Sequence, residues 1–171
     1  MERIWAPWRM DYIVNEKPAG CIFCVSNNGG EQDRQSLILC RTPLSLVMLN
    51  RYPYNNGHLM VAPLRHTADL NELSPDEMLD LFETLRRCRN ILQDTASPQG
   101  FNIGINLGKA SGAGVDEHLH IHIVPRWNGD TNFMSVISDL RVMPENLQCT
   151  YDKLLPGFAD KNQLNHKVSG R

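Results

Sequence analysis

The sequence predicts an α+β fold in which a sheet of five mainly antiparallel strands carries helices on one face. Short apolar or alternating segments bounded by Gly, Pro or Asn are typical of strands, and one long amphipathic segment is typical of a helix. At 171 residues the chain has the length of a single domain. We expect that domain to span residues 1–155, with an N-terminal extension, and residues 156–171 to form a loose polar tail.

Turn residues separate the predicted strands. Residues 54–57 read Tyr-Asn-Asn-Gly, which predicts an antiparallel hairpin between the second and third strands. The five expected strands occupy residues 36–41, 46–50, 57–63, 101–106 and 117–125.

The long helix is expected between the third and fourth strands. Ser74 and Glu77, with a proline between them, form the pattern of a capping box. Apolar residues then recur at helical spacing until Ala-Ser-Pro at residues 96–98, where the residue before proline disfavours helical backbone. A shorter helix is expected at residues 144–155.

Composition excludes several classes of protein. Hydrophobic residues make up 42% of the chain, and 17 Lys and Arg stand against 19 Asp and Glu, so we expect no general affinity for nucleic acid or membrane. The sequence contains no apolar run of membrane-spanning length and no signal-peptide pattern. Five cysteines, an odd number, argue against a disulfide framework. These features predict a cytoplasmic protein.

Three histidines alternate with apolar residues in the last predicted strand, HLHIHIV. Because successive side chains of a strand point to opposite faces, His118, His120 and His122 are expected to share one face, about 6.6 Å apart along the chain. Three imidazoles offer no packing advantage there, but a phosphate chain can lie along them. If the middle ring, His120, attacks phosphorus, it forms a phosphoramidate, and the flanking rings would then orient it and bind phosphate oxygens. One nitrogen of His120 must then be held by a nearby carbonyl or carboxylate.

A glycine-rich segment, GKASGAG at residues 108–114, precedes this strand. Its backbone N–H groups can converge on an anion, which makes Lys109, Ser111, Gly112 and Gly114 candidate substrate-binding residues. The segment is neither a P-loop nor a dinucleotide fingerprint, because its lysine and glycines stand at the wrong positions. A plain turn is the alternative.

The CIFC sequence places Cys21 and Cys24 in a CxxC pair. This spacing is typical of half a zinc site or of a redox pair, and two buried thiols are the third alternative. A tetrahedral site needs two further ligands, which His58, His66 or the histidines of the last strand can supply.

HLHIHIV resembles the signature of the histidine triad superfamily of nucleotide hydrolases and transferases. The runs VMLNRYPYNNGHLMVAPLRH, GFNIGINLG and VPRWNGDTNFM resemble the branch that holds the fragile histidine triad hydrolases and the bacterial diadenosine tetraphosphate phosphorylases. APWRMDYI and CIFC resemble those bacterial members, so the resemblance covers about residues 5 to 155.

The resemblance implies a HIT-like fold and a homodimer whose two sheets join into one ten-stranded sheet. It implies that His120 becomes nucleotidylated, that His122 contacts the phosphates and that Asn50 binds the ribose hydroxyls. His58 matches a histidine close to the α-phosphate, with a strand-end histidine satisfied by the backbone as the alternative. Asn106 lies one position from a glutamine that holds the leaving phosphates in the hydrolases.

In zinc-bearing relatives the metal is held by the CxxC pair, a later histidine and the first histidine of the triad. The resemblance therefore implies a structural zinc site made by Cys21, Cys24, His66 and His118. Two sulfurs and two nitrogens suit a closed tetrahedral site that does not activate water. The chemistry itself needs no metal in the protein, although magnesium is compatible with the polyphosphate substrate.

The function implied is a nucleotidyltransferase that splits diadenosine tetraphosphate into ADP and ATP, with phosphate as acceptor. The alternative is a diadenosine polyphosphate hydrolase or an adenosine phosphoramidate hydrolase, which uses water. Two non-enzymatic classes are a nucleotide sensor, which would lack the middle histidine, and a zinc-only structural protein, which would leave Asn50 and the glycine-rich loop unused.

Overall fold

The computed structural model describes residues 20–25, 30–130 and 145–159. Within them, five strands form one sheet in the order β1-β2-β3-β5-β4, and every neighbouring pair is antiparallel. The predicted α+β class and the predicted hairpin pairing of β2 with β3 are therefore confirmed. The strands are β1 (Ile38–Arg41), β2 (Ser45–Leu49), β3 (Leu59–Pro63), β4 (Gly100–Ile105) and β5 (Ile121–Arg126).

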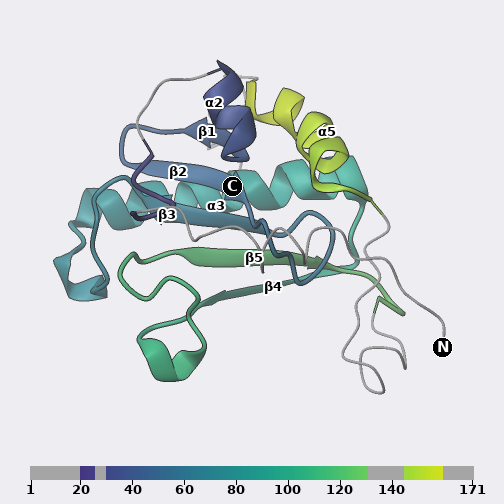
Figure 1. Ribbon diagram of the computed structural model, residues 1–171. Coiled ribbons are helices and arrows are strands. Elements are labelled where there is room, and N and C mark those ends of the chain that lie inside the picture. Colours follow the sequence, from purple (N-terminus) through teal and green to yellow (C-terminus); the bar gives the residue numbers. More distant parts are fainter. Residues whose placement is uncertain (1–19, 26–29, 131–144, 160–171) are drawn as a thin grey trace, which may run out of the picture.

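The long helix α3 (Pro75–Ala96) runs behind the sheet, and α5 (Leu147–Ala159) packs on it and on β1 (Figure 1). Helix α3 begins as predicted: the Ser74 hydroxyl accepts from the Glu77 N–H, and the Glu77 carboxylate accepts from the Ser74 N–H. Such a cap stabilises a helix by about 1 kcal/mol. The remaining elements are α2 (Gly30–Gln35), η1 (Leu70–Glu72) and η2 (Lys109–Ser111).

Apolar residues pack on both faces of β1, β2 and β3. On the helix side, alternate strand residues such as Val47, Leu49 and Val61 pack against α3 and α5. On the opposite side lies a smaller group, which we call the front cluster. It comprises Phe23, Ile38, Leu46, Met48, Met60 and Ala62. The CIFC segment thus supplies part of the cover of the face that does not carry α3.

The shorter helix differs from its prediction at the C-terminal end. It continues to Ala159 and contains Pro156, whereas residues 156–171 were expected to be a loose tail. A proline inside a helix loses one backbone hydrogen bond, but tertiary contacts compensate. Phe158 is buried in the helix-side core, and Arg87 of α3 donates to its carbonyl at 2.6 Å. Residues 160–171, like the N-terminal extension before Gly20, lie outside the described part of the chain.

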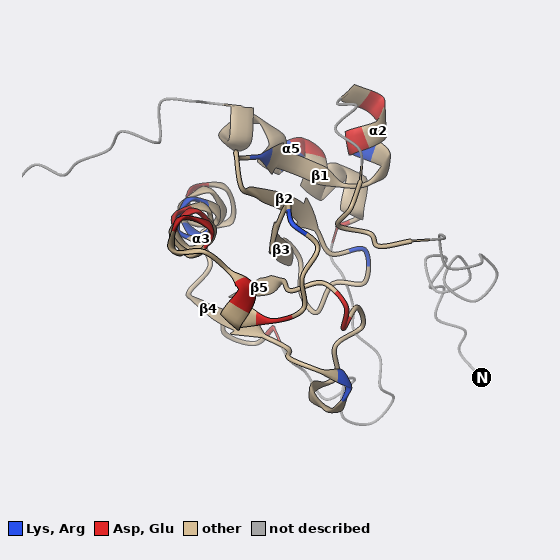
Figure 2. Cartoon of the chain, turned by 90° about the vertical axis from the view of Figure 1, so that its left-hand side faces the viewer, with Lys and Arg blue, Asp and Glu red and all other residues tan. Residues whose placement is uncertain are grey.

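No helix in the described ranges is long and apolar enough to cross a membrane. Acidic and basic residues are scattered over several elements in Figure 2, as the balanced composition predicts.

Candidate active site and metal centre

The last strand begins later than predicted. It starts at Ile121, so His118 and His120 precede it, and only His122 lies within the strand. The cause is the residue that faces this segment: β3 ends at Pro63, which has no N–H to continue the ladder. The Leu119 N–H instead donates to the Thr67 carbonyl at 2.6 Å. The three histidines nevertheless stay together, with the ring centroids of His120 and His122 4.7 Å apart.

His120 has the tautomer that a nucleophile requires. Its Nδ1 lies 2.8 Å from the His118 carbonyl oxygen, which can only accept, so Nδ1 carries the proton and Nε2 keeps its lone pair. Burial lowers the pKa of His120 below its ordinary value, and the bond to the carbonyl offsets this only in part. The expected carbonyl partner is thus present, and it comes from the neighbouring histidine.

A second chain of hydrogen bonds sets the tautomer of His122. The Tyr54 N–H donates to Nδ1 of His58 at 3.1 Å, so the proton of His58 must reside on Nε2. That nitrogen lies 2.9 Å from Nδ1 of His122 and donates to it. His122 is left with a proton on Nε2, which makes this nitrogen a hydrogen-bond donor. His58, directly before β3, thus links the backbone of Tyr54 to His122.

Both rings are neutral at physiological pH. Burial, followed by the neighbouring rings His122 and His120, lowers the pKa of His58 to about 3. Burial, followed by His120, lowers the pKa of His122 to about 4. The cluster therefore offers one nucleophilic nitrogen on His120 and one donor on His122, without a formal charge.

The four residues predicted to hold zinc converge. The Sγ atom of Cys21 lies 3.2 Å from Nδ1 of His118, and that of Cys24 lies 3.2 Å from Nδ1 of His66. All four ligand atoms lie within 4.8 Å of one another. The other nitrogen of His118 donates to the Pro63 carbonyl at 2.9 Å, which leaves Nδ1 with the lone pair that a metal needs. Two sulfurs and two nitrogens fit zinc, and the tautomer of one of the two rings, His118, is already fixed.

The predicted substrate-binding residues differ in how near they lie to the histidines. The Asn50 N–H donates to the His58 carbonyl at 2.9 Å, so Asn50 adjoins the His58–His122 pair. Asn106 follows β4 directly, and Ile105 of that strand pairs with Ile121.

The glycine-rich loop forms the exposed turn η2. The N–H groups of Ser111 and Gly112 donate to carbonyls within the loop, and so does the Ser111 hydroxyl. Those donors do not converge on an anion in this conformation. Lys109 is 90% exposed and lies 3.8 Å from Asp116, and Gly114 is also exposed.

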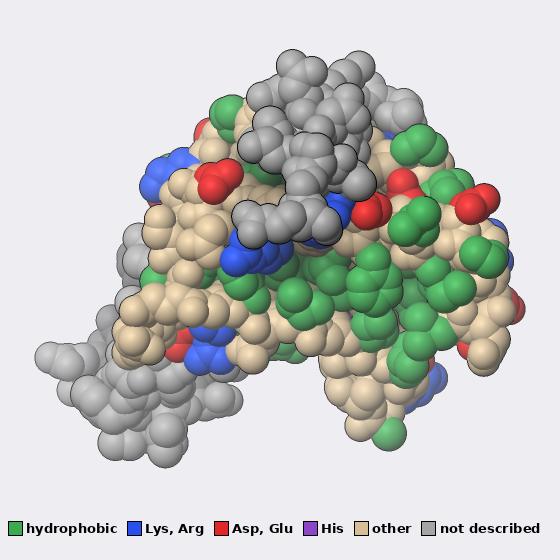
Figure 3. Space-filling view, turned by 180° about the vertical axis from the view of Figure 1, so that it is seen from behind, with side chains coloured by type: hydrophobic (Ala, Val, Ile, Leu, Met, Phe, Trp, Pro, Cys, Tyr) green, Lys and Arg blue, Asp and Glu red, His purple; other side chains and the backbone are tan. Residues whose placement is uncertain are grey.

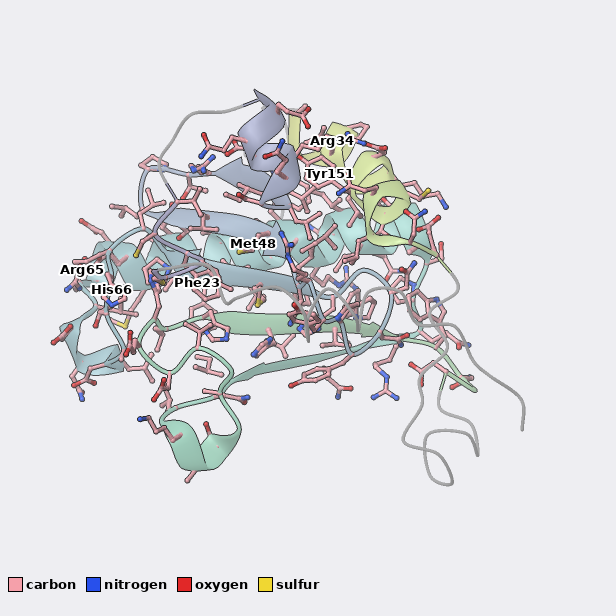
Figure 4. All side chains as sticks on the ribbon, in the orientation of Figure 1. Phe23, Arg34, Met48, Arg65, His66 and Tyr151 are labelled. Atoms are coloured by element: carbon pink, nitrogen blue, oxygen red, sulfur yellow. The ribbon has the colours of Figure 1, made fainter. Side chains whose placement is uncertain are left out.

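Two residues that the sequence interpretation missed adjoin the site. Phe23, between the two cysteines, packs its ring against both His118 and His120. In Figure 4 it lies near His66 at the left-hand end of the sheet. Gly104 pairs with His122 across β4 and β5, and a Cβ added there would meet nothing within 4 Å. A glycine inside a strand is the signal that could have indicated this open space.

Comparison with known proteins agrees with this geometry. A family model described as "HIT domain" matches residues 31–129. An AP-4-A phosphorylase from Mycobacterium tuberculosis is 36% identical over 167 residues, covering 93% of this chain and 85% of that protein. An asymmetrical bis(5'-nucleosyl)-tetraphosphatase from Schizosaccharomyces pombe is 34% identical, covering 68% of this chain and 64% of its own.

A solved structure of a Zn-bound histidine triad family protein from Mycobacterium smegmatis superposes with a TM-score of 0.63. It is 26% identical and covers 85% of this chain and 97% of that one. These matches and the arrangement of the three histidines lead to one conclusion: the chain belongs to the HIT domain family.

Proposed function

We propose that the protein is a cytoplasmic nucleotidyltransferase that splits diadenosine tetraphosphate into ADP and ATP through a covalent intermediate on His120. The observation that carries the proposal is the pair of tautomers: a free Nε2 lone pair on His120 beside an Nε2–H donor on His122. The similarity to the AP-4-A phosphorylase, over 93% of the chain, supports the choice of substrate. Reduced cysteines such as Cys21 and Cys24 suit the cytoplasm.

In the first step, Nε2 of His120 attacks an α-phosphorus. The new N–P bond replaces the bond from that phosphorus to the bridging oxygen, and ATP departs. The Nε2–H of His122 donates a hydrogen bond to the departing oxygen as its negative charge develops. Nδ1–H of His120 stays bonded to the His118 carbonyl, which stabilises the positive charge that the ring acquires.

In the second step, an oxygen of inorganic phosphate attacks the same phosphorus. The N–P bond breaks, His120 regains its lone pair, and the product is ADP. The sum of the two steps is diadenosine tetraphosphate plus phosphate giving ATP plus ADP. Splitting one difficult displacement into two easier ones is the general advantage of such an intermediate.

The second candidate passes the nucleotidyl group to water and gives AMP plus ATP. The similarity to the S. pombe tetraphosphatase favours it. The two functions differ in one measurement: purified protein is incubated with diadenosine tetraphosphate, with and without inorganic phosphate, and the nucleotides are separated. Phosphate-dependent ADP and ATP are expected. AMP and ATP in phosphate-free buffer would instead assign water as the acceptor.

We also propose that Cys21, Cys24, His66 and His118 hold a structural zinc ion, as their donor set and convergence support. Bound there, zinc would cross-link the N-terminal segment to the sheet, and four protein ligands leave no open position for water. Magnesium is proposed only as a companion of the polyphosphate substrate.

We also propose that the protein is a homodimer. Apolar side chains that remain exposed near the edge strand β4 support this proposal. This strand is at the edge of the sheet. Ile103 points to the helix side, as its partner Ile123 does, but remains 50% exposed. On α3, Phe82 is 64% exposed, and Figure 3 shows hydrophobic side chains gathered on this rear face. Pairing β4 with its copy would cover them and extend the sheet to ten strands.

Light scattering after size exclusion tests the homodimer. We expect the mass of a dimer for the wild type and of a monomer for Phe82→Glu, which places a charge in the proposed interface. A wild-type monomer at micromolar concentration would contradict the proposal.

A further inference from the structure

Phe23 contacts the proposed nucleophile from the middle of the CIFC turn. Its ring centroid lies 4.8 Å from that of His120, with 31° between the planes, and 5.1 Å from that of His118. Only 2% of Phe23 is exposed, and its other neighbours are residues of the front cluster. The phenyl ring is thus enclosed between the sheet and the two imidazoles.

This contact supplies a restraint that the hydrogen bond of His120 lacks. A bond from Nδ1 to the His118 carbonyl holds one atom of the ring at 2.8 Å, but the broad angular range of a hydrogen bond still allows some rotation of the ring about its Cβ–Cγ bond. The tilted ring of Phe23 and the edge contact with His122 restrict that rotation. The direction of the Nε2 lone pair therefore depends on where Phe23 lies.

The position of Phe23 depends in turn on the four metal-binding residues. Cys21 and Cys24 flank it, and the Cys24 N–H donates to the Cys21 carbonyl at 3.1 Å, closing the turn. The thiol of Cys21 adjoins His118, and that of Cys24 adjoins His66. The turn is thereby held at Cys21, two residues before Phe23, and at Cys24, directly after it.

We propose that Phe23 is a positioning residue for His120, and that the state of the Cys21–Cys24 turn reaches the nucleophile through this ring. The inference rests on the proposed nucleotidyl transfer through His120. The metal centre would then affect the reaction rate through the packing of Phe23 on His120, in addition to anchoring the N-terminal segment.

The test replaces the ring without emptying its space. Phe23→Met keeps most of the volume but has no flat face, and Phe23→Leu is a second variant in case the first folds poorly. Leu81→Ala, in the helix-side core, is the control for a loss of stability remote from the site. Each protein is assayed below its melting temperature, with zinc present. We expect kcat to fall about 10- to 100-fold in the Phe23 variants with KM within about twofold, and kcat to be unchanged in the control.

A spectroscopic readout complements the kinetics. Imidazole NMR of the wild type, before and after chelation of the metal, follows the ring protons of His120, which lie within the ring-current field of Phe23. We expect chelation to shift or broaden them in the wild type and to have a smaller effect in Phe23→Met.

The outcomes separate this inference from the proposed function. An unchanged kcat in the Phe23 variants, or a raised KM alone, would overturn the positioning role. His120 ring-proton signals that do not change on chelation would overturn it as well. If the wild type forms no nucleotidyl-histidine at His120, the proposed function fails first. If it does form one and Phe23→Met forms it equally fast, only the positioning role fails.

Discussion

The low pKa values of His58 and His122 predict a loss of stability in weak acid. An unfolded histidine takes up a proton near pH 6.5, whereas the folded rings stay neutral down to pH values of about 3 for His58 and about 4 for His122. As the pH falls below 6.5, the unfolded state therefore binds protons that the folded state does not bind. Folding stability decreases throughout that window and is fully retained above it.

The size of the effect follows from the unfolded pKa alone as long as the folded value is lower than the pH studied. Between pH 7 and pH 5.5, each such histidine lowers the free energy of unfolding by about 1.3 kcal/mol. Replacing His58 with Gln removes one of these groups. The acid-induced loss should thus be about 1.3 kcal/mol smaller in His58→Gln than in the wild type, whatever the absolute stability of the variant.

Urea unfolding at a series of pH values, with zinc present throughout, measures this difference. Between pH 7.5 and pH 8.5 the two proteins should lose or gain stability in parallel, because histidines are neutral in both states there. Equal slopes between pH 6.5 and pH 5 would refute the reasoning. They would mean that folded His58 accepts a proton as readily as an unfolded histidine.

Three further predictions concern the chemistry and its support. His120→Ala should lower turnover by at least about a thousandfold with an unchanged circular dichroism spectrum, and substantial residual turnover would remove His120 from the role of nucleophile. Cys21→Ser should lower the melting temperature of the zinc-loaded protein but matter little after chelation; equal melting curves with no metal bound would contradict a structural zinc. Gly104→Val should raise KM about tenfold or more without lowering the melting temperature, because its side chain would occupy open space beside His122; an unchanged KM would show that substrate lies elsewhere.

Local patterns in the sequence predicted the fold well. The capping box at Ser74 and the apolar spacing behind it located α3, because both signals arise from interactions between residues close in the chain. Resemblance to known relatives predicted the group of four residues that converges in the structure, Cys21 with Cys24, His66 and His118. No periodicity would have paired residues so distant in sequence.

The errors arose where a residue's conformation depends on a distant partner. The strand predicted at 117–125 begins only at Ile121, because the residue of β3 that faces the preceding segment is Pro63, which has no N–H. Cross-strand register is not visible in either segment alone. Likewise, Pro156 marks a helix end in isolation, yet α5 continues because Arg87 and the helix-side core hold Phe158. Tertiary contacts overrode local preference in both cases.

The tautomers of the site are set largely by the backbone. Carbonyls of Pro63 and His118 and the N–H of Tyr54 determine which nitrogen of each ring carries a proton. A carboxylate partner would stabilise an imidazolium, whereas these dipoles support buried neutral rings. The chain has a net charge of −2, and a neutral site offers little attraction to a polyphosphate anion. A cation bound to the substrate would reduce the negative charge that the site must accommodate. We therefore expect magnesium to lower KM with little effect on kcat.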